Sequence, residues 1–142
     1  MNDLHEIRRG ALLALCQFDA GGDDDMASVR AGLAAVDVPP QLIDAAMALA
    51  EDAWGARTET DEATGPLMTE WPIHRQPRVD RSLIRLAAWE IRSKRTPPRV
   101  VIDEAVELAR EFSTEDSPRF VNGVLDRYWH GLETPPPVEQ LD

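Results

Sequence analysis

Residues 97–129 read PPRVVIDEAVELAREFSTEDSPRFVNGVLDRYW and hold two helical patterns separated by a short polar stretch. In 98–112 the apolar residues recur at spacings of three and four, which is the period of one helix face. Pro98 suits the first position of this helix, where a backbone N–H would be unpaired in any case. Ser117 and Pro118 predict the next helix start, with Ser117 as the N-cap.

The same periodicity covers most of the chain and predicts an all-α protein, because sustained alternation of apolar and polar residues is lacking. The polar stretch GARTETDEATGP, bounded by Gly and Pro, predicts a loop at 55–66. A short helix at 66–71 is only weakly indicated. The expected helices are 4–18, 26–36, 40–54, 78–94, 98–112 and 118–129.

These elements predict a compact bundle of about six or seven helices. We expect one domain over 1–130, with an N-terminal helical subdomain at 1–77 and a C-terminal one at 78–130. The end of the chain, 131–142, is acidic and rich in proline, and it is expected to be a flexible tail.

The pair Asn122-Gly123 is typical of a turn, yet it lies in the middle of the last predicted helix. Glycine inside a helix costs about 1 kcal/mol relative to alanine. Such a cost is usually offset when another helix approaches too closely for a side chain. We therefore expect Gly123 to be a packing notch.

The charge is unevenly distributed. Its total is −11, which argues against nucleic acid as a partner. However, residues 1–70 contain four Arg against fourteen acidic residues, whereas residues 71–130 contain ten Arg and one Lys against nine. A locally basic surface can therefore coexist with an acidic total.

Few residues suggest catalysis, a metal or a cofactor. Cys16 lies within a helical pattern and predicts a small core residue, and a single cysteine is typical of a reducing cytoplasm. The three histidines lack the spacing of a metal site. Asp103 and Glu107 could act as acid and base, but Arg99 offers Asp103 an ordinary i,i+4 partner. No enzyme is predicted.

Two sets of residues each allow two interpretations. The basic cluster Arg92, Lys94, Arg95 and Arg99 is either a solvated helix end or a surface that faces phosphates. At the start of the last helix, Arg119 and the helix N-terminus favour phosphate, and Phe120 could stack on an unpaired base. Alternatively, Phe120 belongs to the core.

The C-terminal part closely resembles the NusB family. The resemblance rests on VDRSLIRLAAWEI and on the stretch quoted above, and it covers about 78–129. The first helix, with RRGALLALCQFD, is similar more weakly. The positions in step with the family pattern are Leu86, Glu90, Ile102, Glu104, Ala105, Glu107, Asp116, Ser117, Phe120, Asn122 and Gly123.

The resemblance implies an all-α fold and an RNA-binding factor for transcription antitermination. Such proteins pair with a ribosomal protein of the NusE type on single-stranded boxA-like RNA, within the transcription elongation complex, and support ribosomal RNA synthesis in the cytoplasm. The resemblance places Asp80 in the protein-partner surface, and it leaves a monomer or a homodimer open. The RNA-binding residues that it implies are Arg8, Arg9, Asp116, Ser117, Arg119 and Phe120.

The chain departs from the family pattern in its first helix. Leu4, His5 and Glu6 occupy positions where the family carries several arginines, and Cys16 takes the place of a tyrosine. Each lost phosphate contact weakens binding to RNA. A second hypothesis follows, in which the chain is a protein–protein interaction module with weak or lost RNA binding.

Overall fold

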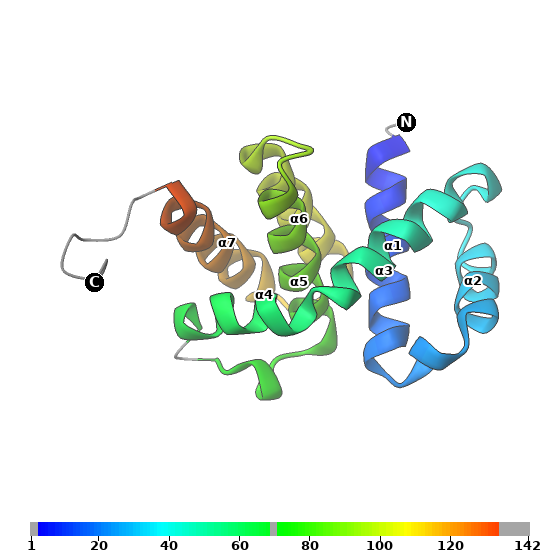
Figure 1. Cartoon of the computed structure of the whole chain (residues 1–142), viewed down its shortest axis with the longest axis horizontal. Helices are drawn as coiled ribbons and strands as arrows, with labels where there is room; N and C mark the ends of the chain where they lie inside the picture. Colours follow the sequence, from blue (N-terminus) through cyan, green and yellow to red (C-terminus); the bar gives the residue numbers. More distant parts are fainter. Residues whose placement is uncertain (1–2, 69–70, 134–142) are drawn as a thin grey trace.

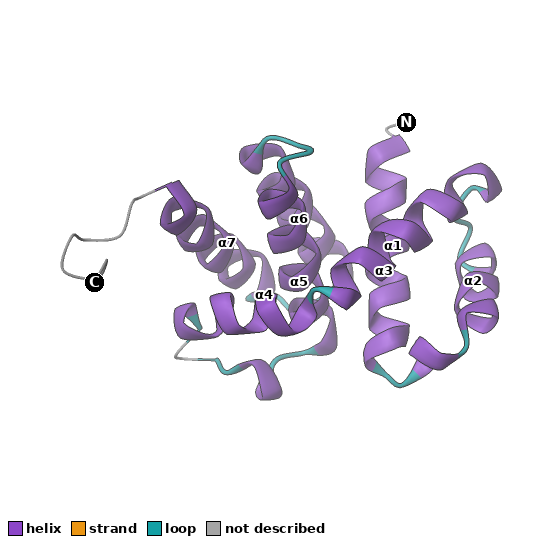
Figure 2. Ribbon diagram, viewed as in Figure 1, coloured by secondary structure: helices purple, strands orange, loops and turns teal. Residues whose placement is uncertain are grey.

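The computed structural model describes residues 3–68 and 71–133, and this part of the chain is helical with no strand (Figure 2). Four short 3-10 turns, at Gly22–Asp24, Pro40–Leu42, Gly65–Leu67 and Ile73–Arg75, connect the longer helices. The predicted all-α fold is confirmed. The α-helices are α1 (Asp3–Asp19), α2 (Met26–Ala35), α3 (Ile43–Gly55), α4 (Arg57–Thr64), α5 (Arg78–Ser93), α6 (Pro98–Phe112) and α7 (Ser117–Glu133).

Helix α5 is the centre of the molecule. It packs against α1 and α3 on one side and against α6 and α7 on the other, so that α2 and α7 lie at opposite ends (Figure 1). Accordingly, α5 buries residues on nearly every face, among them Leu83, Ile84 and Leu86. A helix that touches two groups of helices requires an apolar surface wider than the usual single stripe.

One continuous core joins both groups of helices. Phe18 of α1, Leu83 of α5, Ile102 of α6 and Leu125 of α7 are all nearly inaccessible to solvent and belong to the same cluster. The subdomain boundary between residues 77 and 78 stays a prediction. Within the described residues, no helix combines the length and the apolar character that a membrane span needs.

The predicted loop at 55–66 is wrong, because most of it forms α4. Charged residues of α4 pair with α5: Asp61 lies 2.6 Å from Arg85, and Glu59 lies 3.0 Å from Arg92. Local composition indicates a loop, but the cations of α5 lie far along the chain and hold the polar segment in a helix.

The last helix is longer than predicted. Ser117 is its first residue and not a preceding N-cap, and the helix continues to Glu133. Residues 131–133 are therefore helical, which corrects the start of the predicted tail, and 134–142 lie outside the described residues. The weak helix predicted at 66–71 is reduced to a 3-10 turn at Gly65–Leu67, and residues 69 and 70 also lie outside the described part.

The expectation that Gly123 is a packing notch is wrong. A Cβ atom there would meet only the flexible end of Arg127, at 3.6 Å. The tight approach occurs instead at Gly10 in α1, where a Cβ atom would lie 2.9 Å from the Cβ atom of Ala46 in α3. Gly10 thus lets α1 and α3 pack closely.

Candidate nucleic-acid interface

The start of α7 presents two charged residues to solvent. The side chains of Asp116 and Arg119 are 82% and 89% exposed, and the carboxylate lies 3.8 Å from the guanidinium. Phe120 is half-buried and packs edge-on against Trp71, with 4.8 Å between the ring centroids. Phe120 therefore fits both predicted roles in part. It contacts the core, and part of its ring stays accessible to a base.

Ser117 points inward, unlike its neighbours in the sequence. It is fully buried, and its hydroxyl donates a 2.9 Å hydrogen bond to the carboxylate of Asp80. The same oxygen accepts a 3.2 Å hydrogen bond from the backbone N–H of Thr114. The side chain therefore fixes the turn before α7 and is not available to a ligand at the surface.

Asp80 is fully buried as well. Its carboxylate accepts hydrogen bonds from the hydroxyls of Ser113 and Ser117 at the junction of α6 and α7. A buried carboxylate costs free energy unless hydrogen bonds compensate for lost hydration, and these two donors do so. Asp80 thus lies behind the predicted RNA surface, and its side chain does not itself form an exposed partner surface.

The two arginines of α1 are also bound within the fold. Arg8 is 4% exposed, and its Nε atom lies 3.0 Å from both carboxylate oxygens of Glu90 in α5. Arg9 lies 2.9 Å from Glu6 and also donates to the backbone carbonyl of Val36 at 3.3 Å. The part of α1 predicted to meet RNA therefore offers little free positive charge.

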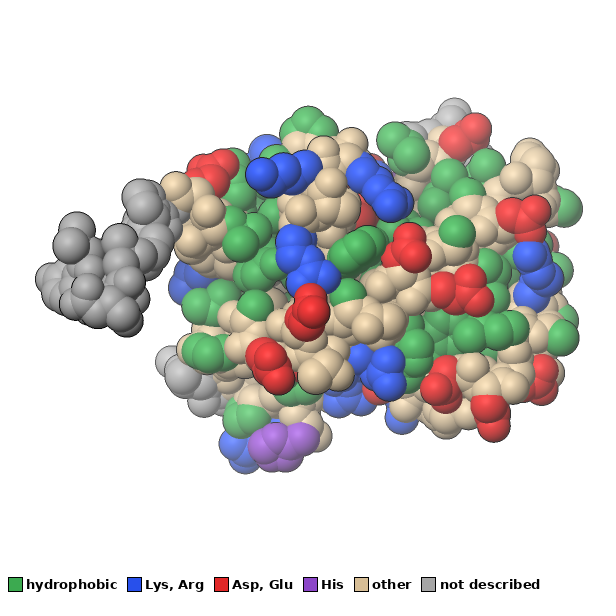
Figure 3. All heavy atoms as spheres, in the orientation of Figure 1, with side chains coloured by type: hydrophobic (Ala, Val, Ile, Leu, Met, Phe, Trp, Pro, Cys, Tyr) green, Lys and Arg blue, Asp and Glu red, His purple; other side chains and the backbone are tan. Residues whose placement is uncertain are grey.

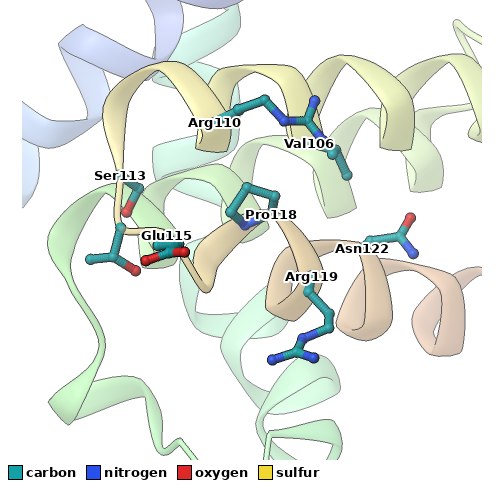
Figure 4. Close-up of a pocket in the computed structure, with 8 residues that line it drawn as sticks. Val106, Arg110, Ser113, Glu115, Pro118, Arg119 and Asn122 are labelled. Atoms are coloured by element: carbon teal, nitrogen blue, oxygen red, sulfur yellow. The ribbon is translucent and has the colours of Figure 1, made fainter.

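A groove of about 560 Å³ separates the end of α6 from the start of α7. Figure 4 shows Pro118 between two cations, Arg110 on α6 and Arg119 on α7. Arg110 was missed from the sequence, although its spacing from Val106 places both residues on one face of α6, and Ser113 follows directly after the helix.

The other candidate residues, Cys16, Asp103 and Glu107, lie in the core or on an ordinary helix surface. Burial raises the pKa of the Cys16 thiol, in agreement with the predicted core position. Asp103 and Glu107 are 69% and 63% exposed, and Arg99 lies 3.9 Å from Asp103 as the spacing predicts. Across residues 3–68 and 71–133, no group of three His, Cys, Asp or Glu could hold a metal ion.

The basic cluster at the α5–α6 turn is mostly paired. Arg92 contacts Glu59 at 3.0 Å, Arg99 contacts Asp126 at 3.0 Å, and Arg95 lies 4.0 Å from Asp52. On the face in Figure 3, Lys and Arg gather around this turn, whereas acidic side chains are spread over α3, α4 and the 3-10 turn that precedes α2. The pairing favours the interpretation of the cluster as a solvated helix end.

These features define an all-helical protein whose central helix joins two groups of helices and whose last helix starts beside a groove lined by two arginines. The chain belongs to the NusB family, because the family model matches residues 5–129. The resemblance seen in the sequence is thereby confirmed.

Two relatives are similar over most of their length and a third over less than half, and each is named Transcription antitermination protein NusB. The protein of Saccharopolyspora erythraea is 38% identical over 129 residues, which cover 89% of this chain and 86% of the relative. That of Anaeromyxobacter dehalogenans is 40% identical over 127 residues, or 88% and 89% of the two chains. A Streptomyces griseus relative reaches 62% identity over 60 residues, or 42% of each chain.

Solved structures share the fold. T. maritima NusB aligns with a TM-score of 0.77 at 27% identity and covers 92% of both chains. A structure of the antitermination factors NusB and NusE in complex with dsRNA aligns with a TM-score of 0.78, covering 92% of this chain and 98% of the other. At 23% identity, the second likeness concerns the fold alone.

Proposed function

We propose that this chain is a transcription antitermination factor that binds boxA-type RNA together with a NusE-type ribosomal protein. The observation that supports this most is the near full-length match to relatives named as antitermination proteins. In the solved complex of NusB with NusE and dsRNA, the aligned chain has the same fold, and that complex combines a NusE protein with an RNA, although a double-stranded one. The factor would act in the transcription elongation complex and support ribosomal RNA synthesis.

Within this assembly, the start of α7 contacts the RNA. Asp116 and Arg119 are the exposed charged residues, and the accessible part of Phe120 offers a face to a base. Arg8, Arg9 and Ser117 act from behind the surface, because their polar groups hold α1 and α7 in place. Asp80 likewise acts through α7 and not by direct contact.

The role that we propose is binding without catalysis. Asp103 and Glu107 are exposed, and Asp103 has Arg99 as a partner. Both carboxylates therefore belong to a solvated helix face. Transcription in bacteria places such a factor in the cytoplasm. Whether it acts as a monomer or a homodimer depends on surfaces that the proposed RNA site does not use.

A second candidate function is a protein–protein module of the same fold that has lost RNA recognition. The observation that favours it is that both arginines of α1 are paired with carboxylates of the same chain. Because phosphate contacts supply much of the affinity for nucleic acid, their loss would leave binding dependent on the partner.

An RNA titration with and without the NusE-type protein separates the two functions. We expect a fluorescein-labelled boxA single strand to bind more tightly when the partner is present. The affinity should fall as the KCl concentration rises from about 50 to 200 mM. Capture of the partner with no RNA binding even at 50 mM would instead select the protein–protein module.

A further inference from the structure

The exposed positive charge near the α7 start comes from α6 and α7, not from α1. The side chain of Arg119 is 89% exposed and that of Arg110 is 60% exposed, whereas Arg8 is only 4% exposed. Both Arg110 and Arg119 line the α6–α7 groove. An RNA strand that reaches α7 would therefore meet its first exposed guanidinium groups here.

Besides the two arginines, the groove is lined by apolar and by uncharged or acidic polar side chains. Val106 and Pro118 give it an apolar lining, and Figure 4 shows Pro118 between the two arginines. Asn122 lines the groove, is exposed, and within the described residues no hydrogen bond of its side-chain amide is seen. Glu115 adds one carboxylate acceptor.

We infer that the α6–α7 groove is a subsite for one nucleotide of single-stranded RNA. This inference rests on the proposed function and extends it to Arg110 and Asn122. The guanidinium groups of Arg110 and Arg119 hold phosphate oxygens, and the base lies on Pro118. Asn122 can donate to and accept from a base edge, while Glu115 accepts from an exocyclic amino group.

The opposing charges in the groove limit what it can bind. Glu107 pairs with Arg110 on the same helix, and Asp116 lies 3.8 Å from Arg119. A phosphate therefore competes with nearby carboxylates, which is possible because all four side chains are exposed and hydrated. The arrangement favours a nucleotide over a bare anion, since the base supplies additional contacts with Pro118 and Asn122.

The test measures binding of a labelled boxA single strand by the complex of this chain with its NusE-type partner. Arg110→Ala should weaken binding about tenfold, because a charge-assisted contact is lost. It should also reduce the slope of log affinity against log salt by about 0.7, the value for one phosphate on a single strand. Arg30→Ala removes the same charge from α2, at the other end of the molecule, and should change neither.

Asn122→Ala tests base recognition separately. It should reduce the preference for boxA over a homopolymeric uridine strand severalfold and leave the salt slope unchanged. If the unaltered complex binds boxA and both variants behave like Arg30→Ala, the groove is not a nucleotide subsite. Loss of partner capture by Arg110→Ala, with RNA binding retained, would assign the groove to protein and overturn the inference. A complex that binds no RNA would overturn the proposed function itself.

Discussion

The hydroxyl of Ser117 donates a 2.9 Å hydrogen bond to the carboxylate of Asp80, 37 residues earlier in the chain. Both residues are fully buried, and Ser113 donates to the other carboxylate oxygen. The first turn of α5 is thereby joined to the start of α7. The exposed residues Asp116 and Arg119 flank Ser117, so this bond sets the position of the surface that we propose for RNA.

Replacement of Asp80 should destabilise the protein and weaken RNA binding together. In Asp80→Ala, the hydroxyls of buried Ser117 and half-buried Ser113 lose their acceptor, and hydrogen bonds to charged groups contribute about 1.5–3 kcal/mol. We expect a loss of that size in the free energy of unfolding, measured with urea. Asp103→Ala removes an exposed carboxylate and should stay within about 0.5 kcal/mol. Equal stability of the two variants would contradict the buried role of Asp80.

Arg8 should matter for stability more than for direct contact with RNA. Its side chain is 5% exposed and that of Glu90 is 8% exposed, so Arg8→Ala leaves an unpaired charge in the interior. Breaking a buried pair in this way costs about 3–5 kcal/mol. Thermal and urea unfolding of Arg8→Ala measure the loss.

The double variant Arg8→Met with Glu90→Leu tests the reason for that loss. It removes both charges at similar volume, and it should be more stable than Arg8→Ala alone. A double variant that is less stable than the single one would show that the cost does not arise from the unpaired carboxylate.

Two glycine substitutions should have opposite effects. Gly10→Ala forces a Cβ atom to 2.9 Å from that of Ala46 and should cost about 1–3 kcal/mol. Gly123→Ala meets only the mobile end of Arg127 at 3.6 Å and should stabilise α7 by about 1 kcal/mol. Urea unfolding of both variants gives the signs, and a destabilised Gly123→Ala would contradict the open space seen beside α7.

Cys16 should react slowly with thiol reagents. Burial is the main cause that raises its pKa, so less of the reactive thiolate is present near neutral pH than for a free cysteine. We expect iodoacetamide to modify the folded chain more slowly than the urea-unfolded chain, with a rate that rises as pH increases.

The raised pKa of Cys16 also predicts the sign of a stability change. Because the unfolded thiol loses its proton first, the free energy of unfolding should fall as pH rises above the ordinary thiol range. Cys16→Ala should lack this part of the pH dependence. An unchanged dependence in that variant would mean that the thiol does not contribute.

Local patterns determined the long helices. The spacing of apolar residues gives α5 and α6 nearly to the residue, and the acidic run before α2 ends in Asp25, whose carboxylate accepts a 3.1 Å hydrogen bond from the N–H of Ser28. Such features depend on neighbours within a few positions. The motif around Asp116 and Phe120 also pointed to the NusB family from the sequence alone.

Tertiary contacts decided the remainder. The sequence could not show that α4 is helical, because Asp61 meets its partner Arg85 only after the chain folds. Nor could it separate Arg8, paired inside with Glu90, from Arg119 at the surface, since both are arginines in the N-terminal half of a helix. Burial and pairing depend on which distant residues meet in space. The sequence thus determined the helices and the family, and the tertiary structure decided which charged groups remain free for a partner.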